Sequence, residues 1–228
     1  MMRILLLLLL ALPLRAQDLV APILLTAPAG APAVVFGEEN VVSTTGSGAS
    51  TTQAFTVTNA DLIIVCVTAT WAAPTGVTFN GDALTEQTSR EYSGYGSFIY
   101  TRANPDVGTY NVVVSFAGAT DATVTIIGYK KTHNSTPVTA ATENEGTGTA
   151  VSTDVSSASG SVVIDCLGWY NWIATATAAG GQTEKSNQTV GDIGGAVSVK
   201  SGATTTNMAW TISTSREWSH TAISVNPE

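Results

Sequence analysis

The stretch Asp61-Leu-Ile-Ile-Val-Cys66 decides the fold, because a closely similar stretch, Gly160-Ser-Val-Val-Ile-Asp-Cys166, stands in the second half of the chain. The turn-forming pair Asn80-Gly81 matches Gly180-Gly181 at the same spacing. Beyond this turn the second copy is two residues shorter, and the correspondence then continues in step. A repeat of this kind indicates one supersecondary unit that the chain uses twice. The matched pairs beyond the turn are Glu86 with Glu184, Arg102 with Lys200, and Tyr110 with Met208.

Short strand signals separated by Gly, Asn and Asp run through both copies, and no helical period is visible. The clearest signal is the hairpin at 77–84, because Asn80-Gly81 favours the positive φ angles of a type I′ turn. In the first copy, about 50–132, we expect strands at 53–58, 62–71, 76–79, 83–88, 97–102, 109–116 and 122–131. In the second copy, about 148–226, we expect them at 150–153, 162–174, 182–185, 195–200, 206–213 and 219–225.

Alternating apolar residues identify strand faces that a partner sheet must bury. Tyr110 and Val112 share one face, and Met208 and Trp210 share the equivalent face of the second copy. We therefore predict an all-β fold, a jelly-roll-like β-sandwich built from two homologous halves related by a pseudo-twofold axis. Two tandem immunoglobulin-like domains are the alternative, although each copy alone has a modest apolar content for an independent core. Trp71 and Trp210 are expected in the core.

The first residues have the pattern of a secretory signal peptide, which we expect at 1–16. Arg3 precedes the apolar run 4–14, and the small residue Ala16 stands where signal peptidase would cut. The apolar run is well short of the ~18 residues of a membrane-spanning helix. The pattern predicts a secreted, extracellular or cell-surface protein, with the periplasm as an alternative, and no membrane span once the signal is removed.

The rest of the chain divides by composition. Residues 17–48 are rich in Ala, Pro and Gly and are interpreted as a linker or an N-terminal strand, with the β-sandwich at 49–228. The polar stretch 133–148 contains Pro137 and is the expected connection between the two copies.

The charge of the chain argues against two classes of partner. Lys and Arg together number 9 against 17 Asp and Glu, giving a net charge of −8 over 228 residues. Nucleic-acid binding requires a basic face that neutralises phosphates, so we expect no nucleic-acid partner. Anionic membrane surfaces are disfavoured for the same reason.

The hairpin Val77-Thr-Phe-Asn-Gly-Asp-Ala-Leu-Thr85 is followed by Phe98-Ile-Tyr-Thr-Arg-Ala-Asn-Pro-Asp-Val-Gly-Thr-Tyr-Asn-Val-Val-Val114. Together they resemble a widespread group of bacterial secreted and phage-associated β-sandwich domains. These domains carry a V-T-[WF]-N-G-x-A-L-T hairpin, then a strand ending near N-P, then G-T-Y-x-V-x-V. The resemblance covers most of residues 51–225 and implies a surface or adhesion context. It implies no catalytic residue.

Aromatic residues give the one indication of a binding site. Trp169, Asp165 and Asn171 share one face of a predicted strand, and Tyr92 and Tyr95 flank a Gly-rich loop. Sugar rings stack on exposed aromatic faces, while carboxylate and amide groups bond their hydroxyls. We therefore predict that these five residues form a ligand-binding surface with an exposed Trp169.

Cys66 and Cys166 are the only cysteines, and an exported chain permits a disulfide between them. The alternative is that each is a small buried residue on its own strand. His133 and His220 are the only histidines, so we expect no metal site and no cofactor. Calcium dependence is left open, because scattered loop aspartates could converge in space.

The sequence favours a secreted, non-catalytic surface or binding module, with polysaccharide or cell-surface glycan as the ligand. The alternative is a structural or adhesive component of an envelope, matrix or virion, which would self-associate. A glycan-active enzyme is less favoured. It would use a carboxylate pair such as Glu86 and Glu184, which the repeat itself pairs without any need for catalysis.

Overall fold

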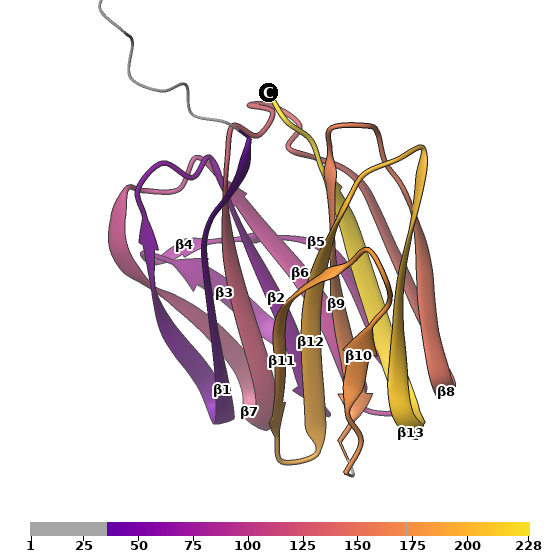
Figure 1. Ribbon diagram of the computed structural model, residues 1–228. Helices are drawn as coiled ribbons and strands as arrows, with labels where there is room; N and C mark the ends of the chain where they lie inside the picture. The colour runs from indigo at the N-terminus through magenta and orange to yellow at the C-terminus, as the bar shows by residue number, and fades with distance from the viewer. Residues whose placement is uncertain (1–35, 172) are drawn as a thin grey trace, which may run out of the picture. The chain divides into compact units, whose positions relative to one another are not determined.

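The computed structural model describes residues 36–171 and 173–228, and the expected signal peptide at 1–16 lies outside them. The described residues form strands and turns in two antiparallel sheets, which confirms the predicted all-β sandwich (Figure 1). Among these residues, no helix has the length and apolar character needed to cross a membrane.

The first sheet contains seven strands from the first half of the described chain. Their order is β4-β3-β7-β2-β6-β5, and β1 pairs with β7 beside this path. The strands are β1 (Gly37–Val57), β2 (Leu62–Thr70), β3 (Pro74–Phe79), β4 (Asp82–Ala83), β5 (Thr85–Tyr92), β6 (Tyr95–Ala103) and β7 (Gly108–Lys130).

The second sheet contains six strands from the second half of the described chain. Their order is β10-β13-β9-β12-β11, and β8 pairs with β13 beside this path. Apart from β4, each strand of the first sheet thus has a counterpart in the second, in the same order. The homology of the halves stays a prediction. The strands are β8 (Val138–Ser156), β9 (Val162–Tyr170), β10 (Ala176–Ala178), β11 (Thr183–Val190), β12 (Ile193–Ser201) and β13 (Thr205–Val225).

Strands β7 and β13 are each longer than we expected, because each joins two predicted strands into one. The first part of β7 pairs with β3 and its last part with β2, while β1 follows it along both parts. The register between β1 and β7 breaks between Gly48 and Ser50, and that between β8 and β13 breaks between Thr211 and Arg216. Such irregularities bend a strand. Each sheet can therefore fold over its own apolar cluster.

The core consists of apolar layers on both sides of the central strands. One cluster lies within the first half and includes Phe55, Val65 and Phe79. A second lies between the two sheets and includes Ile64 and Ile164. The second half encloses its own clusters around Trp210 and Met208. Strand β2 is consequently buried along its whole length, as expected for a strand covered on both faces.

The two sheets contact one another through reciprocal pairs of strands. Edge strand β5 meets β8, where Arg90 forms an ion pair with Glu145 at 2.6 Å. Edge strand β11 meets β1, where Lys185 forms an ion pair with Glu38 at 2.7 Å. Between these edges the backbones approach closely. A Cβ atom on Gly195 would lie 2.0 Å from the Thr123 hydroxyl, so only glycine fits there.

Two predicted boundaries differ from the structure. Strand β1 begins at Gly37, so the described end of the predicted segment 17–48 is an N-terminal strand rather than a linker. Strand β8 begins at Val138, so most of the predicted connection 133–148 belongs to the second sheet. Segment 133–148 is polar because β8 exposes much of one face, and it therefore resembles a loop in the sequence. The Ala, Pro and Gly of segment 17–48 likewise resemble a linker.

Candidate functional site

Trp71 directly follows β2 and contacts Gly94 in the loop after β5. The loops after β2, β5, β9 and β11 gather at one end of the sheets (lower end of Figure 1). The Trp71 side chain is 75% exposed, and the backbone is left-handed with φ of 59°. The backbone N–H of Trp71 donates a hydrogen bond to the Gly94 carbonyl at 2.7 Å. A Cβ on Gly94 would lie 2.5 Å from the indole ring, so the ring packs on the glycine backbone. The indole is therefore held in place while most of its surface meets solvent.

A row of aromatic rings extends from Trp71 into the second half of the chain. The Trp71 and Tyr95 ring centroids are 6.1 Å apart, and the Tyr95 and Tyr170 rings stack at 5.1 Å with an interplanar angle of 28°. The Arg216 guanidinium lies 5.8 Å from the Tyr170 ring centroid. Burial, together with the neighbouring Tyr170, raises the pKa of Tyr95 to about 12. The contacts in this row therefore hold aromatic rings from both halves in fixed relative positions.

A hollow of about 270 Å³ adjoins Trp71 and carries polar groups from both halves. Asp121 on β7 accepts a hydrogen bond from the Ser47 hydroxyl at 2.5 Å, and its backbone N–H donates to the Thr70 hydroxyl at 3.3 Å. Asp192, in the exposed turn between β11 and β12, contributes a second carboxylate. An exposed ring beside two carboxylates and several hydroxyls can stack on a flat apolar face and accept hydrogen bonds from a polyol.

The loop after β9 adds an apolar side chain to the same end. Ile173 is 85% exposed and has φ of 53°. Its N–H donates to the Asn171 carbonyl, and the Asn171 N–H donates to the Asp192 carbonyl at 2.8 Å. A left-handed backbone is an outlier for bulky or β-branched residues and persists only where the surroundings hold it. The loops after β2 and β9 thus each expose a large apolar side chain, that of Trp71 and that of Ile173, on a residue with a strained backbone.

The predicted exposed site at Trp169 and Asp165 is wrong, because both side chains are 0% exposed. Strand β9 is covered on both faces, so the face that we expected to line a groove packs inside the second half. The Trp169 indole N–H donates to the Ala174 carbonyl at 3.4 Å. The prediction for Trp71 is also wrong, since it is exposed, whereas Trp210 is buried as expected.

Asp165 is the centre of a buried hydrogen-bond network. One carboxylate oxygen accepts the Ser198 N–H at 2.8 Å and the Ser198 hydroxyl at 2.7 Å. The other accepts the Trp210 indole N–H at 2.7 Å and lies 3.0 Å from His220 Nε2. His220 Nδ1 is in turn 2.8 Å from the Thr153 hydroxyl. A buried carboxylate requires such partners, and here four donors satisfy it.

The order Thr153, His220, Asp165 has the donor and acceptor types of a hydroxyl nucleophile with a base and an orienting carboxylate. None of the three is accessible, because Thr153 is 5% exposed and the other two are fully buried. A substrate could not reach the hydroxyl without opening the second half. The hydrogen-bond network of these three residues therefore organises the core of the second half.

The remaining predicted site residues lie at or near the aromatic end. Tyr95 belongs to the aromatic row, and Asn171 is part of the loop beneath it. Tyr92 is half-buried at the end of β5, with its hydroxyl 3.5 Å from that of Thr147.

Glu86 and Glu184 lie on β5 and β11, at edges of different sheets, and accept hydrogen bonds from Tyr100 and Asn187 respectively.

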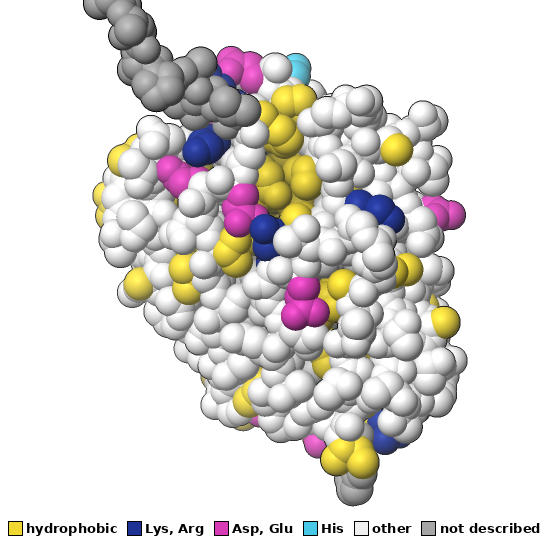
Figure 2. Space-filling model, in the orientation of Figure 1, with side chains coloured by type: hydrophobic (Ala, Val, Ile, Leu, Met, Phe, Trp, Pro, Cys, Tyr) yellow, Lys and Arg dark blue, Asp and Glu magenta, His cyan; other side chains and the backbone are white. Residues whose placement is uncertain are grey.

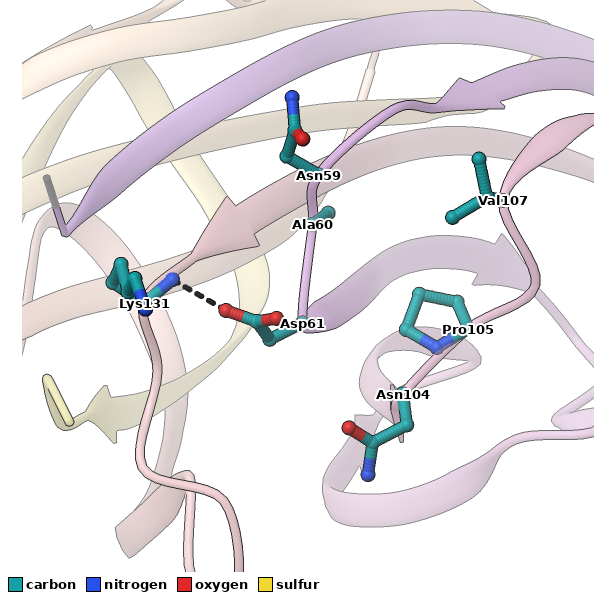
Figure 3. Close-up of a pocket in the computed structure, with 7 residues that line it drawn as sticks. All are labelled: Asn59, Ala60, Asp61, Asn104, Pro105, Val107 and Lys131. Atoms are coloured by element: carbon teal, nitrogen blue, oxygen red, sulfur yellow. Dashed lines mark hydrogen bonds between the residues drawn. The ribbon is translucent and has the colours of Figure 1, made fainter. Parts of the chain in front are cut away.

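Two other hollows lie away from this end. The first, of about 380 Å³, is at the opposite end of β2, where Asp61 accepts the Lys131 N–H at 2.5 Å and Val107 is exposed (Figure 3). The Asp61 backbone N–H donates to the Tyr129 carbonyl and the Asp61 carbonyl accepts the Asn104 N–H, so Asp61 joins the end of β7 to the loop after β6. The second lies where the sheets meet beside Phe36, and Figure 2 shows apolar side chains there.

No protein-family model, curated protein or solved structure matches the chain. Within the part of the chain that the structure describes, no group of three or more His, Cys, Asp or Glu is placed to hold a metal ion.

Proposed function

We propose that the chain is a secreted, non-catalytic binding module whose aromatic end binds carbohydrate. The observation that carries the proposal is Trp71, an indole that is 75% exposed yet fixed on Gly94 by a left-handed backbone. Isolated exposed apolar residues need no explanation, but an ordered one on a strained backbone suggests selection for the surface itself. The proposed location outside the cell or in the periplasm rests on the predicted signal peptide.

The neighbours of Trp71 favour a sugar over other ligands. The indole offers a flat ring for stacking, and Asp121 and Asp192 offer acceptors for sugar hydroxyls. The hollow of about 270 Å³ is smaller than the ~300–1,000 Å³ of enclosed small-molecule sites. An exposed aromatic ring beside a small polar hollow suits a polysaccharide that lies along the surface and places one sugar unit in the hollow. The negative charge of the chain favours neutral or basic glycans.

The test is a titration of the full chain with soluble cellulose derivatives, xylan, mixed-linkage β-glucan and chito-oligosaccharides, with and without calcium. Affinity electrophoresis or calorimetry would measure the dissociation constant. We expect Trp71→Ala to weaken binding by about tenfold or more, as truncation of a central aromatic contact does. Trp71→Phe should retain part of the affinity. Val107→Ala, which truncates an exposed apolar residue at the opposite end of β2, is the matched control and should bind normally.

The two carboxylates give an independent arm of the same test. Asp192→Asn and Asp121→Asn each remove an acceptor while preserving shape, and we expect each to weaken binding about three- to tenfold. Binding that is unaffected by these variants and by Trp71→Ala would reject the site. If no glycan in the panel binds the wild-type chain, the carbohydrate proposal itself fails.

Ile173 favours a second candidate function, a structural or adhesive component that self-associates. Ile173 and Trp71 together place two exposed apolar side chains at one end of the molecule. Sedimentation velocity over a range of concentrations would measure assembly. If the chain forms oligomers that Ile173→Ser dissolves, and no glycan binds, the adhesive function replaces the first proposal.

A glycan-active enzyme is the least favoured reading. It would need two carboxyl groups about 5–10 Å apart on either side of a glycosidic bond, and Asp121 and Asp192 are the accessible pair beside Trp71. We expect no new reducing ends when a bound polysaccharide is incubated with the chain. Release of reducing ends that Asp192→Asn abolishes would establish the enzyme instead.

A further inference from the structure

Cys66 and Cys166 lie together at the place where the two sheets meet. Cys66 is on β2 and Cys166 on β9, the central strands of the two halves, and both belong to the apolar cluster between the sheets. The Cys166 thiol donates a hydrogen bond at 3.5 Å to the carbonyl of Val67, the residue that follows Cys66. Both cysteines therefore lie in the shared core, one on each central strand. Both are unbonded and buried in the structure.

The pair lies between the middle parts of the two central strands. Each half contributes one thiol from the middle of its buried central strand, so a bond between them would join the sheets across their shared core. The surrounding side chains, such as Ile64 and Ile164, are apolar and exclude water. The pair therefore lies in the shared core and not at the aromatic end.

We propose that Cys66 and Cys166 are an oxidisable dithiol, and that a disulfide between them clasps the two halves of the sandwich. The oxidant is a disulfide of the glutathione class. One cysteine thiolate attacks a sulfur of the oxidant, forms a mixed disulfide and releases one thiol. The second thiolate attacks the first cysteine sulfur, forms the Sγ–Sγ bond and releases the second thiol. Two electrons pass to the oxidant, and the two protons of the cysteine thiols pass through solvent to the released thiolates.

The timing of the reaction follows from the surroundings of the thiols. The hydrogen bond with Cys166, followed by burial, raises the pKa of the Cys66 thiol well above its ordinary value. Only the thiolate attacks a disulfide, and the folded protein shields both sulfurs from the oxidant. Oxidation therefore occurs as the chain folds or when the sheets separate, and the folded, reduced protein reacts slowly.

The test is oxidative refolding of the denatured, reduced full chain in a mixture of oxidised and reduced glutathione. The reaction is quenched with acid, the chain is alkylated in denaturant, and its intact mass is measured. We expect a monomer that has lost two hydrogens and carries no alkyl group. Its urea midpoint should exceed that of the reduced chain by about 2 M, because the bond closes a loop of roughly one hundred residues.

The matched control is Cys166→Ala, which keeps Cys66 and should yield an alkylated or glutathionylated chain without the loss of two hydrogens. The folded, reduced wild-type chain in the same mixture should stay alkylatable over the same period. Two alkyl groups per wild-type chain after refolding, or a disulfide-linked dimer, would overturn the proposal. A bonded monomer whose midpoint does not exceed that of the reduced chain would overturn the clasp.

Discussion

Trp71 and Trp169 stand near the ends of the central strands of the two halves, and one is exposed while the other is buried. Trp169 is inside the ladder, between Gly194 on β12 and Trp218 on β13. A Cβ on Gly194 would lie 2.1 Å from the indole, so the glycine makes room for it. Trp71 instead follows β2 at a left-handed turn and faces outward. The same strand order thus holds one tryptophan in the core and leaves the other exposed to solvent.

The cores behind the two tryptophans differ at matching positions. Val65 on β2 packs in an apolar cluster, whereas Asp165, its counterpart in the predicted repeat, accepts hydrogen bonds from Ser198, Trp210 and His220. The second half therefore depends on a polar network for which the first half has an apolar residue. This difference predicts where each half is most sensitive to substitution.

Asp165→Val places the first half's residue in the second half and should have the largest effect. Ser198, Trp210 and His220 would lose their acceptor inside the core, with a loss of about 3–5 kcal/mol in the free energy of unfolding. Urea denaturation would measure it. Val65→Ala, which only removes methyl groups, is the comparison and should cost about 1–2 kcal/mol. An Asp165→Val chain as stable as wild type would show that the network contributes nothing.

Trp210→Phe separates the network from the packing. The phenyl ring keeps most of the apolar contact but removes the N–H that donates to Asp165 at 2.7 Å, so we expect a loss of about 1.5–3 kcal/mol. Trp169→Phe is the control, because its N–H bonds a neutral carbonyl at 3.4 Å and should cost less, about 1 kcal/mol. Equal losses would argue that ring packing alone determines both values.

Trp71→Ala should change the free energy of unfolding by no more than about 0.5 kcal/mol, since an exposed side chain buries little area. The same denaturation experiment measures it. Iodide or acrylamide quenching of tryptophan fluorescence should fall in this variant, because an accessible indole has been removed. A stability loss comparable to that of Trp210→Phe would mean that Trp71 belongs to the core.

The smallest expected effect concerns the titration of the Tyr95 phenol in the aromatic row. Its pKa is raised from the ordinary 10 to about 12, so it should stay neutral after exposed tyrosines have ionised. A raised pKa in the folded state contributes stability that is complete below pH 10 and is lost as the pH rises towards 12. Tyrosinate absorbance during alkaline titration checks this. Burial also raises the pKa of Tyr100 and Tyr129, so Tyr95→Phe should remove one of several late-titrating phenols. An unchanged titration curve would contradict the buried position.

The fold could be predicted from repeat spacing and strand patterns, but the site could not. The run Leu62–Thr70 lacks alternation because both faces are buried, and a lack of alternation does not show which neighbours cover a strand. A single carboxylate such as Asp165 fits an exposed face or a satisfied core equally well, and only the donors from distant strands decide between them. Trp71 lies at the surface because it follows β2 in a left-handed turn, and in the sequence only the nearby Pro74 indicates that turn.

The most direct test of this account is the indole N–H spectrum of the isotope-labelled full chain during titration with the glycan that binds most tightly. Trp71, assigned with Trp71→Phe, should shift and saturate, while Trp169 and Trp210 keep their positions. That result would establish that the exposed tryptophan binds and that the buried ones stabilise. A Trp71 resonance that does not move at saturating glycan, or a Trp210 resonance that moves with it, would contradict the account.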